Sequence, residues 1–470
     1  MVTDQTIVKT DVGAKDGQTK CPKCGSTDIS VNEKTGTLRC NFCRHEFEAE
    51  GAIGINDDIK GLVGEVRGSG TKDIVKDAND MVTFKCSSCG AEVVVDTSEA
   101  PQARCHWCRN TLSVNQQIPN GAIPDMVLPF GVTKEAAKAQ IEKFVGQRKF
   151  FAHPKFSKEF TTQNIMGVYL PYMVLDINAH AKYNGQGEHL VERFTRGEGK
   201  DQKTFYNADL YDIEREFDLV IDDLTVESSI DKLKRYQSDR TNNVINAIMP
   251  FDTEKCVKWD ANYLKGYSSE KRDANVSDLR DVVTRQSEDI ARVKAHETLK
   301  FYDRGVKWNN ESFVVKGEKW NATYLPVWLY SYQQVKGNKD LIHYVAVNAR
   351  TQETMGSVPI HMPKLLLVTL IFIGLGALGM WFSDFVLDFF LLLPGIIFYF
   401  VYYGKYRNTG ARHAYERKTK TEVTNLRNVD KLVERRNDLT NMSLLGANST
   451  RVSGGTYRTV TTTSNTNKSE

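Results

Sequence analysis

Eight of the nine cysteines in the chain fall into two sets with the same spacing. Each set reads Cys-x2-Cys, then fifteen residues, then Cys-x2-Cys. The first set is Cys21, Cys24, Cys40 and Cys43, and the second is Cys86, Cys89, Cys105 and Cys108. Four thiolates at this spacing are the ligands of a tetrahedral zinc ion in zinc ribbons. The sequence therefore predicts two bound Zn²⁺ ions, one in each set.

Both predicted ligand sets are complete with four thiolates, which leaves no open position for water or substrate. We therefore expect structural rather than catalytic zinc. Iron–sulfur ligation is a weaker alternative, because the pairwise spacing differs from ferredoxin runs. Disulfides are the other alternative, but residues 1–20 lack the apolar core of a signal peptide, which indicates a reducing cytoplasm. His45 and His106 adjoin the closing pairs, and we interpret both as neighbours of the metal sites rather than ligands.

Short strands must bring the two pairs of each set together. In the first set, Ile29 and Val31 alternate before a turn, and Leu38 lies on the returning segment. In the second set, residues 93–95 predict a buried strand. Between the sets, residues 51–80 are rich in Gly, Asp and Lys and predict a linker with a short strand at 61–66. This linker lacks the Gly-x4-Gly-Lys order of a phosphate-binding loop, which counts against an ATP-driven enzyme.

A larger unit is predicted over residues 125–360. Thr133 is a helix cap, and a second helix is expected over 277–295 with Ser277 as its cap. Alternating runs at 168–183 and 213–221 predict strands. The run Tyr169-Leu170-Pro171-Tyr172 is echoed at residues 324–327, so we expect two related β units that flank a helical insertion. We expect their aromatic side chains in the core rather than stacked on nucleic-acid bases.

The sequence shows no constellation that predicts catalysis, and we expect no enzyme. Asp222-Asp223 and the scattered His180, His189 and His343 have no spacing that implies a shared site. Cys256 stands alone and is interpreted as a small, half-buried apolar residue. The net charge of +3 does not provide the concentrated basic face of a nucleic-acid binder.

Residues 365–403 are apolar enough to predict a transmembrane helical hairpin. The spans 365–382 and 385–403 contain one charged residue, Asp388, and are joined by a two-residue turn. Basic residues crowd the segment after 403, so the positive-inside rule places both termini in the cytoplasm. The sequence thus predicts a cell-membrane protein with two spans. A re-entrant hairpin that does not fully cross is the alternative.

The C-terminal part is predicted in two segments. Residues 405–440 are basic and predict a helix, which would lie on anionic lipid, contact DNA or remain in solvent. Residues 441–470 consist mainly of Ser, Thr, Asn and Gly, which is typical of disorder.

The stretch VTFKCSSCGAEVVVDTSEAPQARCHWCRNTLSVNQQIPNGAIPDMVLPF at residues 82–130 resembles a bacterial family of membrane-attached, TFIIB-type zinc-ribbon proteins. Some members are labelled primosomal protein N′, and the similar YdjG-type proteins are linked to membrane-stress complexes. The resemblance covers most of residues 20–400. It implies phage-shock or flotillin-like protein partners at a lipid bilayer. Its cysteine motifs are specific for zinc but not for a function.

The predicted fold class is α+β and multidomain, with two small β zinc ribbons, a mixed β-rich middle domain and a two-helix transmembrane hairpin. The predicted order is a flexible N-terminus at 1–19, zinc ribbon 1 at 20–50, the linker at 51–80, zinc ribbon 2 at 81–115, the cytoplasmic α+β domain at 125–360, the hairpin at 365–403, the basic helix at 405–440 and the tail at 441–470.

We expect a non-enzymatic, membrane-anchored protein that recruits or scaffolds protein partners. The alternative is nucleic-acid binding in transcription or replication through the ribbons. Basic residues that flank the cysteine pairs would then meet phosphates: Lys20, Lys23, Arg39, Arg44, Lys85, Arg104 and Arg109. Nearby glutamates, among them Glu46 and Glu48, partly cancel their charge.

Overall fold

The fold was analysed in a computed structural model of the chain. The residues that the structure describes are 7–9, 21–26, 29–32, 37–48, 58–71, 78–85, 92–95, 117–120, 124–197, 199, 202–229, 248–259, 261–264, 266–270, 272–336, 339–382, 392–407 and 418–439.

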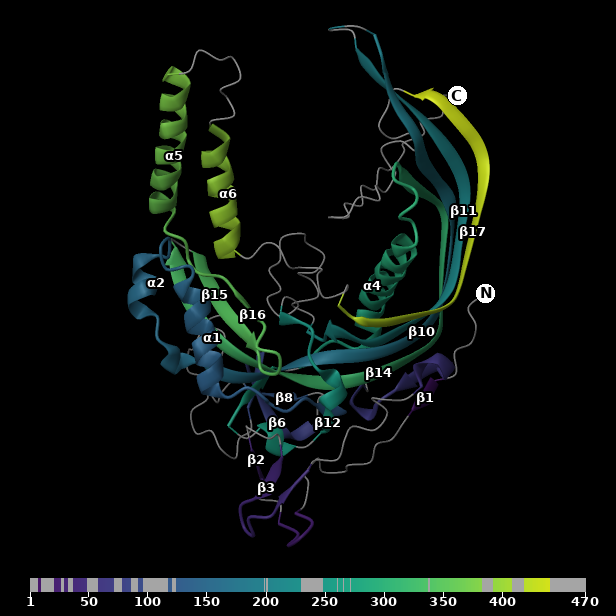
Figure 1. Cartoon of the computed structure of the whole chain (residues 1–470). Helices are drawn as coiled ribbons and strands as arrows, with labels where there is room; N and C mark the ends of the chain where they lie inside the picture. The colour runs from purple at the N-terminus through teal and green to yellow at the C-terminus, as the bar shows by residue number, and fades with distance from the viewer. Residues whose placement is uncertain are drawn as a thin grey trace, which may run out of the picture.

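Very long antiparallel strands form the centre of the molecule. β10 (Met166–Arg196) lies between β11 (Lys203–Glu227) and β14 (Gly305–Lys336), and β15 (Lys339–Asn348) continues from β14. These strands belong to one sheet of 14 strands, which curls strongly (Figure 1). Successive side chains of a strand point to opposite sides. Residues 167–179 of β10 are all buried, so both faces of the sheet are covered there, whereas burial alternates from residue 180 to residue 187.

The two echoed sequence motifs pair with each other. In the antiparallel register of β10 and β14, Tyr169 lies opposite Pro326 and Pro171 opposite Tyr324. The predicted β units are therefore adjacent strands of one sheet rather than separate bodies. Tyr169, Tyr324 and Trp328 are buried, as expected of core aromatics.

One long helix covers the inner side of the curl. α4 (Val276–Glu297) lies inside it (Figure 1), with Leu279, Val283 and Ile290 buried against the sheet. The helix predicted over 277–295 is confirmed. Its cap is Asn275 rather than Ser277, because Asn275 and Asp278 form a capping box.

Two shorter helices pack against the other end of the sheet. α1 (Lys134–Gly146) begins after Thr133, whose side chain accepts a hydrogen bond from the amide of Ala136, so the predicted cap is confirmed. α2 (Pro154–Glu159) follows. Their apolar faces share a buried cluster with Trp328 and Tyr330 of β14.

Short strands complete the sheet. They are β1 (Ile7–Lys9), β5 (Gly64–Arg67), β6 (Ala78–Lys85), β7 (Glu92–Val95), β8 (Gln117–Asn120), β9 (Met126–Val127), β12 (Val257–Lys258), β13 (Ser268–Glu270) and β16 (Thr354–Gly356). β5 comes from the predicted linker, β6 crosses from the linker into the predicted second ribbon, and β7 comes from that ribbon. These segments are thus part of the main sheet, because β5 pairs with β14 and β7 pairs with β13.

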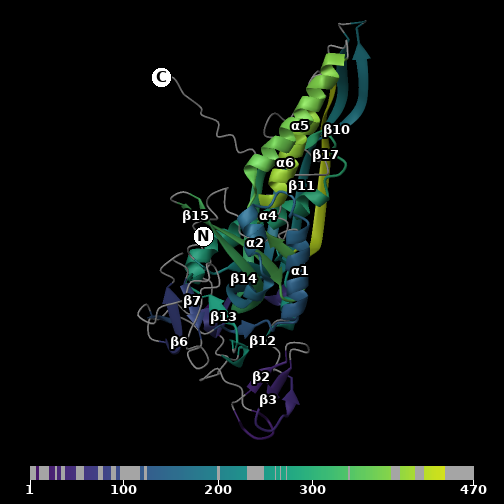
Figure 2. The ribbon, with the colours of Figure 1, turned by 90° about the vertical axis from the view of Figure 1, so that its left-hand side faces the viewer.

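A separate three-stranded sheet holds the first cysteine set. It consists of β2 (Ile29–Val31), β3 (Leu38–Cys40) and β4 (Glu46–Phe47). In both views, β2 and β3 lie at the end of the molecule opposite α5 (Met362–Phe382) and α6 (Leu393–Arg407) (Figures 1 and 2).

The prediction of a transmembrane hairpin over 365–403 is wrong. Within the described part of the chain, no helix has both the length and the apolar character that crossing a membrane requires. A hairpin that crosses twice needs two helices of about 20 residues. α6 has 15 residues and is about 22 Å long, against a hydrocarbon core of about 30 Å. The predicted two-span cell-membrane location is corrected with it.

The predicted fold class is corrected in the same way. The described residues form a β-rich structure around one curled sheet, without the transmembrane hairpin of the predicted α+β assembly. The predicted basic helix over 405–440 is also wrong for most of its length. Residues Lys420–Leu439 form β17, which pairs with β11, so backbone pairing overrides the helical composition.

Candidate metal centre

The first cysteine set is held by two turns with the same geometry. The amide of Gly25 donates to the carbonyl of Cys21, and the amide of Arg44 donates to the carbonyl of Cys40, both at 2.8 Å. Gly25 and Arg44 both have left-handed backbones, with φ of 72° and 60°. β3 ends at Cys40, which lies opposite Ile29 of β2. The small sheet thus brings the second turn beside the first.

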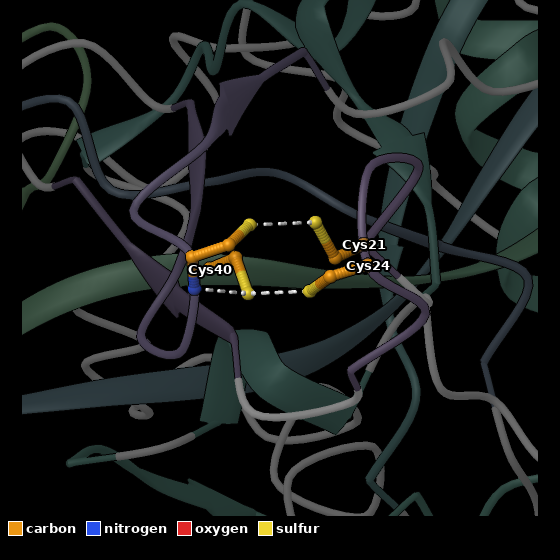
Figure 3. A group of neighbouring side chains, drawn as sticks. Cys21, Cys24 and Cys40 are labelled. Atoms are coloured by element: carbon orange, nitrogen blue, oxygen red, sulfur yellow. Dashed lines mark hydrogen bonds between the residues drawn. The ribbon is translucent and has the colours of Figure 1, made fainter.

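The four sulfur atoms lie at the separations that a metal ion requires. Sγ of Cys21 is 3.5 Å from Sγ of Cys43, and Sγ of Cys24 is 3.6 Å from Sγ of Cys40. All four lie within 4.8 Å of one another. A tetrahedron with Zn–S bonds of about 2.3 Å has S–S edges of about 3.8 Å. Figure 3 shows the labelled thiols of Cys21, Cys24 and Cys40 facing one another. This set could hold one metal ion.

The local backbone favours the charged form of one ligand. The amide of Cys43 donates to Sγ of Cys40 at 3.5 Å. This hydrogen bond, together with those from the neighbouring thiols, outweighs the opposing effect of burial and lowers the pKa of Cys40 to about 6. Cys40 is therefore largely a thiolate at neutral pH, which is the form that binds metal.

His45 lies beside this site and stacks on Phe47, with ring centroids 6.0 Å apart. It does not belong to the four-sulfur group. The second predicted set, Cys86, Cys89, Cys105 and Cys108, lies outside the described residues, and so does His106. β6 comes just before Cys86, and β7 follows Cys89. These two strands pair, with Lys85 of β6 opposite Glu92 of β7.

Sequence reasoning missed a group of carboxylates. Oxygen atoms of Asp176, Asp222 and Asp223 lie within 4.8 Å of one another. They meet where a register irregularity interrupts the pairing of β10 with β11 between Leu175 and Ile177. The amide of Asp223 donates to Oδ1 of Asp176 at 3.2 Å. The Asp222-Asp223 pair was the only sequence signal, because Asp176 lies on another strand.

Two carboxyl groups of this acidic group have raised pKa values. Burial and the charge of Asp223 raise the pKa of Asp176 to about 7, and burial raises the pKa of Asp223 to about 6. The hydroxyl of Thr253 donates to Asp223. Burial also raises the pKa of the Cys256 thiol, which keeps it protonated. Cys256 is fully buried rather than half-buried.

The three scattered histidines do not join either group. Nδ1 of His180 lies 2.9 Å from a carboxylate oxygen of Asp218, and Nδ1 of His189 donates to the backbone carbonyl of Phe301 at 2.8 Å. His343 contacts Ser357 instead. The structure therefore places each histidine in a different local contact.

No protein-family model matches the chain, and neither the curated proteins nor the solved structures compared with it gave a match.

Proposed function

We propose that the first cysteine set binds one structural Zn²⁺ and that the module built on it recruits protein partners without catalysing a reaction. The observation that carries the proposal is the closed group of four sulfur atoms. Thiolates from Cys21, Cys24, Cys40 and Cys43 would complete a tetrahedral shell, which leaves zinc no position for a substrate. The chemistry of the donor set therefore fits a structural ion.

The zinc module is attached to the body by its apolar side. Ile29 and Leu38 are fully buried and share a cluster with Trp259, Tyr263 and Leu264. The metal and this cluster together would hold the module in one orientation. A rigid surface loses little conformational entropy when a partner binds.

The module also presents an exposed aromatic side chain. Phe42 lies between the ligands Cys40 and Cys43, and its side chain is 81% exposed. Aromatic side chains are frequent energetic centres of protein interfaces. We propose Phe42 as the contact through which a protein partner is recruited.

The second cysteine set repeats the spacing of the first, and we propose that it binds a second structural Zn²⁺. The expected metal content is then two zinc ions per chain. The resemblance to membrane-stress proteins supports phage-shock or flotillin-like partners as the first to test.

A crosslinked pull-down of the full-length protein, with nuclease treatment, tests the recruitment. Phe42→Ala should lose the captured proteins but keep its zinc, whereas Cys40→Ser should lose both. Val63→Ala serves as the control, because Val63 is also highly exposed but directly precedes β5, which pairs with β14 in the main sheet. Unchanged capture by Phe42→Ala would contradict the proposal.

A specific observation also supports the second candidate, nucleic-acid binding. Lys23 and Arg44 are exposed on the two turns that hold the cysteines, and Phe42 is exposed on the second of these turns. Cations beside an aromatic ring can bind phosphates while a base stacks. Arg39 is less available, because it pairs with Glu46 at 3.8 Å. Binding of a single-stranded oligonucleotide should then weaken steeply with salt, and Lys23→Gln/Arg44→Gln should reduce that salt dependence.

A further inference from the structure

β17 is the outermost strand along one side of the curled sheet (Figure 1). Within the described chain it pairs only with β11. None of its twenty residues is buried, although β11 beside it contains many buried side chains. Burial of apolar surface therefore contributes little to holding β17 in place.

Charged side chains hold the middle of β17 instead. Asp430 accepts two hydrogen bonds from the guanidinium of Arg215, at 2.6 and 3.3 Å. Arg435 donates two hydrogen bonds to Asp209, at 2.8 and 3.0 Å. Arg436 lies 3.6 Å from a carboxylate oxygen of Glu188.

In each of these pairs the partner on the body is buried and the residue on β17 is more exposed. Arg215 and Asp209 are 2% and 7% exposed, whereas Asp430 and Arg435 are 38% and 62% exposed. Glu188 is fully buried and also pairs with Arg304 on the body at 3.2 Å. A buried charge without a partner is strongly unfavourable. The edge of β11 is therefore built to receive a carboxylate and, five residues later along the incoming strand, a guanidinium.

The backbone pairing of β17 is more irregular than that of the central strands, whose pairings are interrupted in two places each. Its register with β11 is interrupted in three places. Asn425 and Asp438 have φ of 55° and 59°, which extended strands do not adopt. The ion pair between Lys420 and Glu254 at the start of the strand is exposed and is screened by salt.

We propose that the edge of β11 is a binding site for one extended, charged strand, and that β17 is its tethered and releasable occupant. β17 opens as a unit while β10, β11 and β14 stay folded, because the apolar core lies beneath those strands. A segment that carries the same charges at the same spacing then binds the β11 edge by strand addition. This inference is independent of the zinc module and its proposed function.

Hydrogen exchange measured by mass spectrometry on the full-length protein tests the release. Amides of 420–439 should exchange at least about tenfold faster than those of β10, and faster still when salt rises from about 50 to about 500 mM. Asp430→Asn/Arg435→Gln should accelerate exchange in β17 alone. Lys431→Gln is the control, because this exposed lysine forms no ion pair with a described residue. Exchange of β17 and β10 at one common rate in all variants would overturn the proposal.

A fluorescent peptide with the sequence of residues 420–439 tests the acceptor site. It should bind full-length Asp430→Asn/Arg435→Gln more tightly than wild type, because the tethered strand of the variant is a weaker competitor. The Lys431→Gln chain should behave as wild type. A second peptide with Asp430→Lys and Arg435→Glu should fail to bind. Equal binding of both peptides, or binding of neither, would overturn the assignment of this edge as a charge-selective site.

Discussion

Gly25 and Arg44 occupy equivalent positions in the two turns of the metal centre, each four residues after a cysteine and each with a left-handed backbone. Glycine adopts this conformation without a steric penalty, whereas an L side chain costs about 1–2 kcal/mol there. The chain thus combines one relaxed turn and one strained turn around the same group of sulfur atoms.

Arg44→Gly should stabilise the module by about 1 kcal/mol, and Gly25→Ala should destabilise it by a similar amount. A Cβ on Gly25 would meet no atom within 4 Å. Gly25→Ala therefore measures only the free-energy cost of the left-handed backbone conformation. Zinc release to a competing chelator would measure both changes. Equal release rates for the two variants would argue against strain at Arg44.

Metal removal should unfold the module and leave the long strands β10, β11 and β14 intact. Zinc supplies much of the folding free energy of such small units. We expect two zinc ions per wild-type chain by elemental analysis, and one after either Cys21→Ser or Cys86→Ser. After chelation, limited proteolysis should cleave within 21–48 while β10 stays protected. One ion per wild-type chain would refute the second site.

The acidic group should make stability depend on pH. The pKa of Asp176 is about 7 in the folded protein, against 3.8 as its ordinary value. The folded state therefore binds more protons than the unfolded state between about pH 4 and 7, and stability falls as pH rises through this window. Asp176→Asn should raise the free energy of unfolding by roughly 1–3 kcal/mol at pH 8, and by little at pH 4.

Urea unfolding at both pH values measures this effect. Asp212→Asn, on the same strand as Asp222 but outside the acidic group, is a suitable control. A gain in stability from Asp176→Asn that is the same at pH 4 and pH 8 would mean that ionisation of Asp176 is not its cause.

The same substitution should have opposite effects at two glycines. A Cβ on Gly317 would clash with the carbonyl of Leu62, where β5 joins β14, so Gly317→Ala should destabilise the fold by about 2 kcal/mol or more. Gly146 lies at the end of α1 with no atom near its Cβ, so Gly146→Ala should stabilise by about 0.5–1 kcal/mol. Thermal unfolding of both variants provides the comparison.

Local features of the chain were predictable from sequence, and features that depend on distant pairing were not. The four sulfurs of the first set come from two short turns, and the spacing of Cys21 and Cys24 already defines one of them. Thr133 was recognised as a cap for the same reason. Asp176 and Asp222 are far apart in the chain, and only the irregular pairing of β10 with β11 brings them together.

The segment 420–439 shows most clearly where prediction from sequence fails. Its Lys, Arg, Glu and Leu content is typical of a helix, yet it forms β17 because β11 offers both a backbone edge and buried charged partners such as Arg215 and Asp209. The sequence by itself determined the first cysteine set, the alternating strands and the Thr133 cap of α1, since these depend on neighbours along the chain. The tertiary structure alone decided which strands share the curled sheet, where the carboxylates meet and which charges become buried, because those outcomes depend on pairing between residues far apart in sequence.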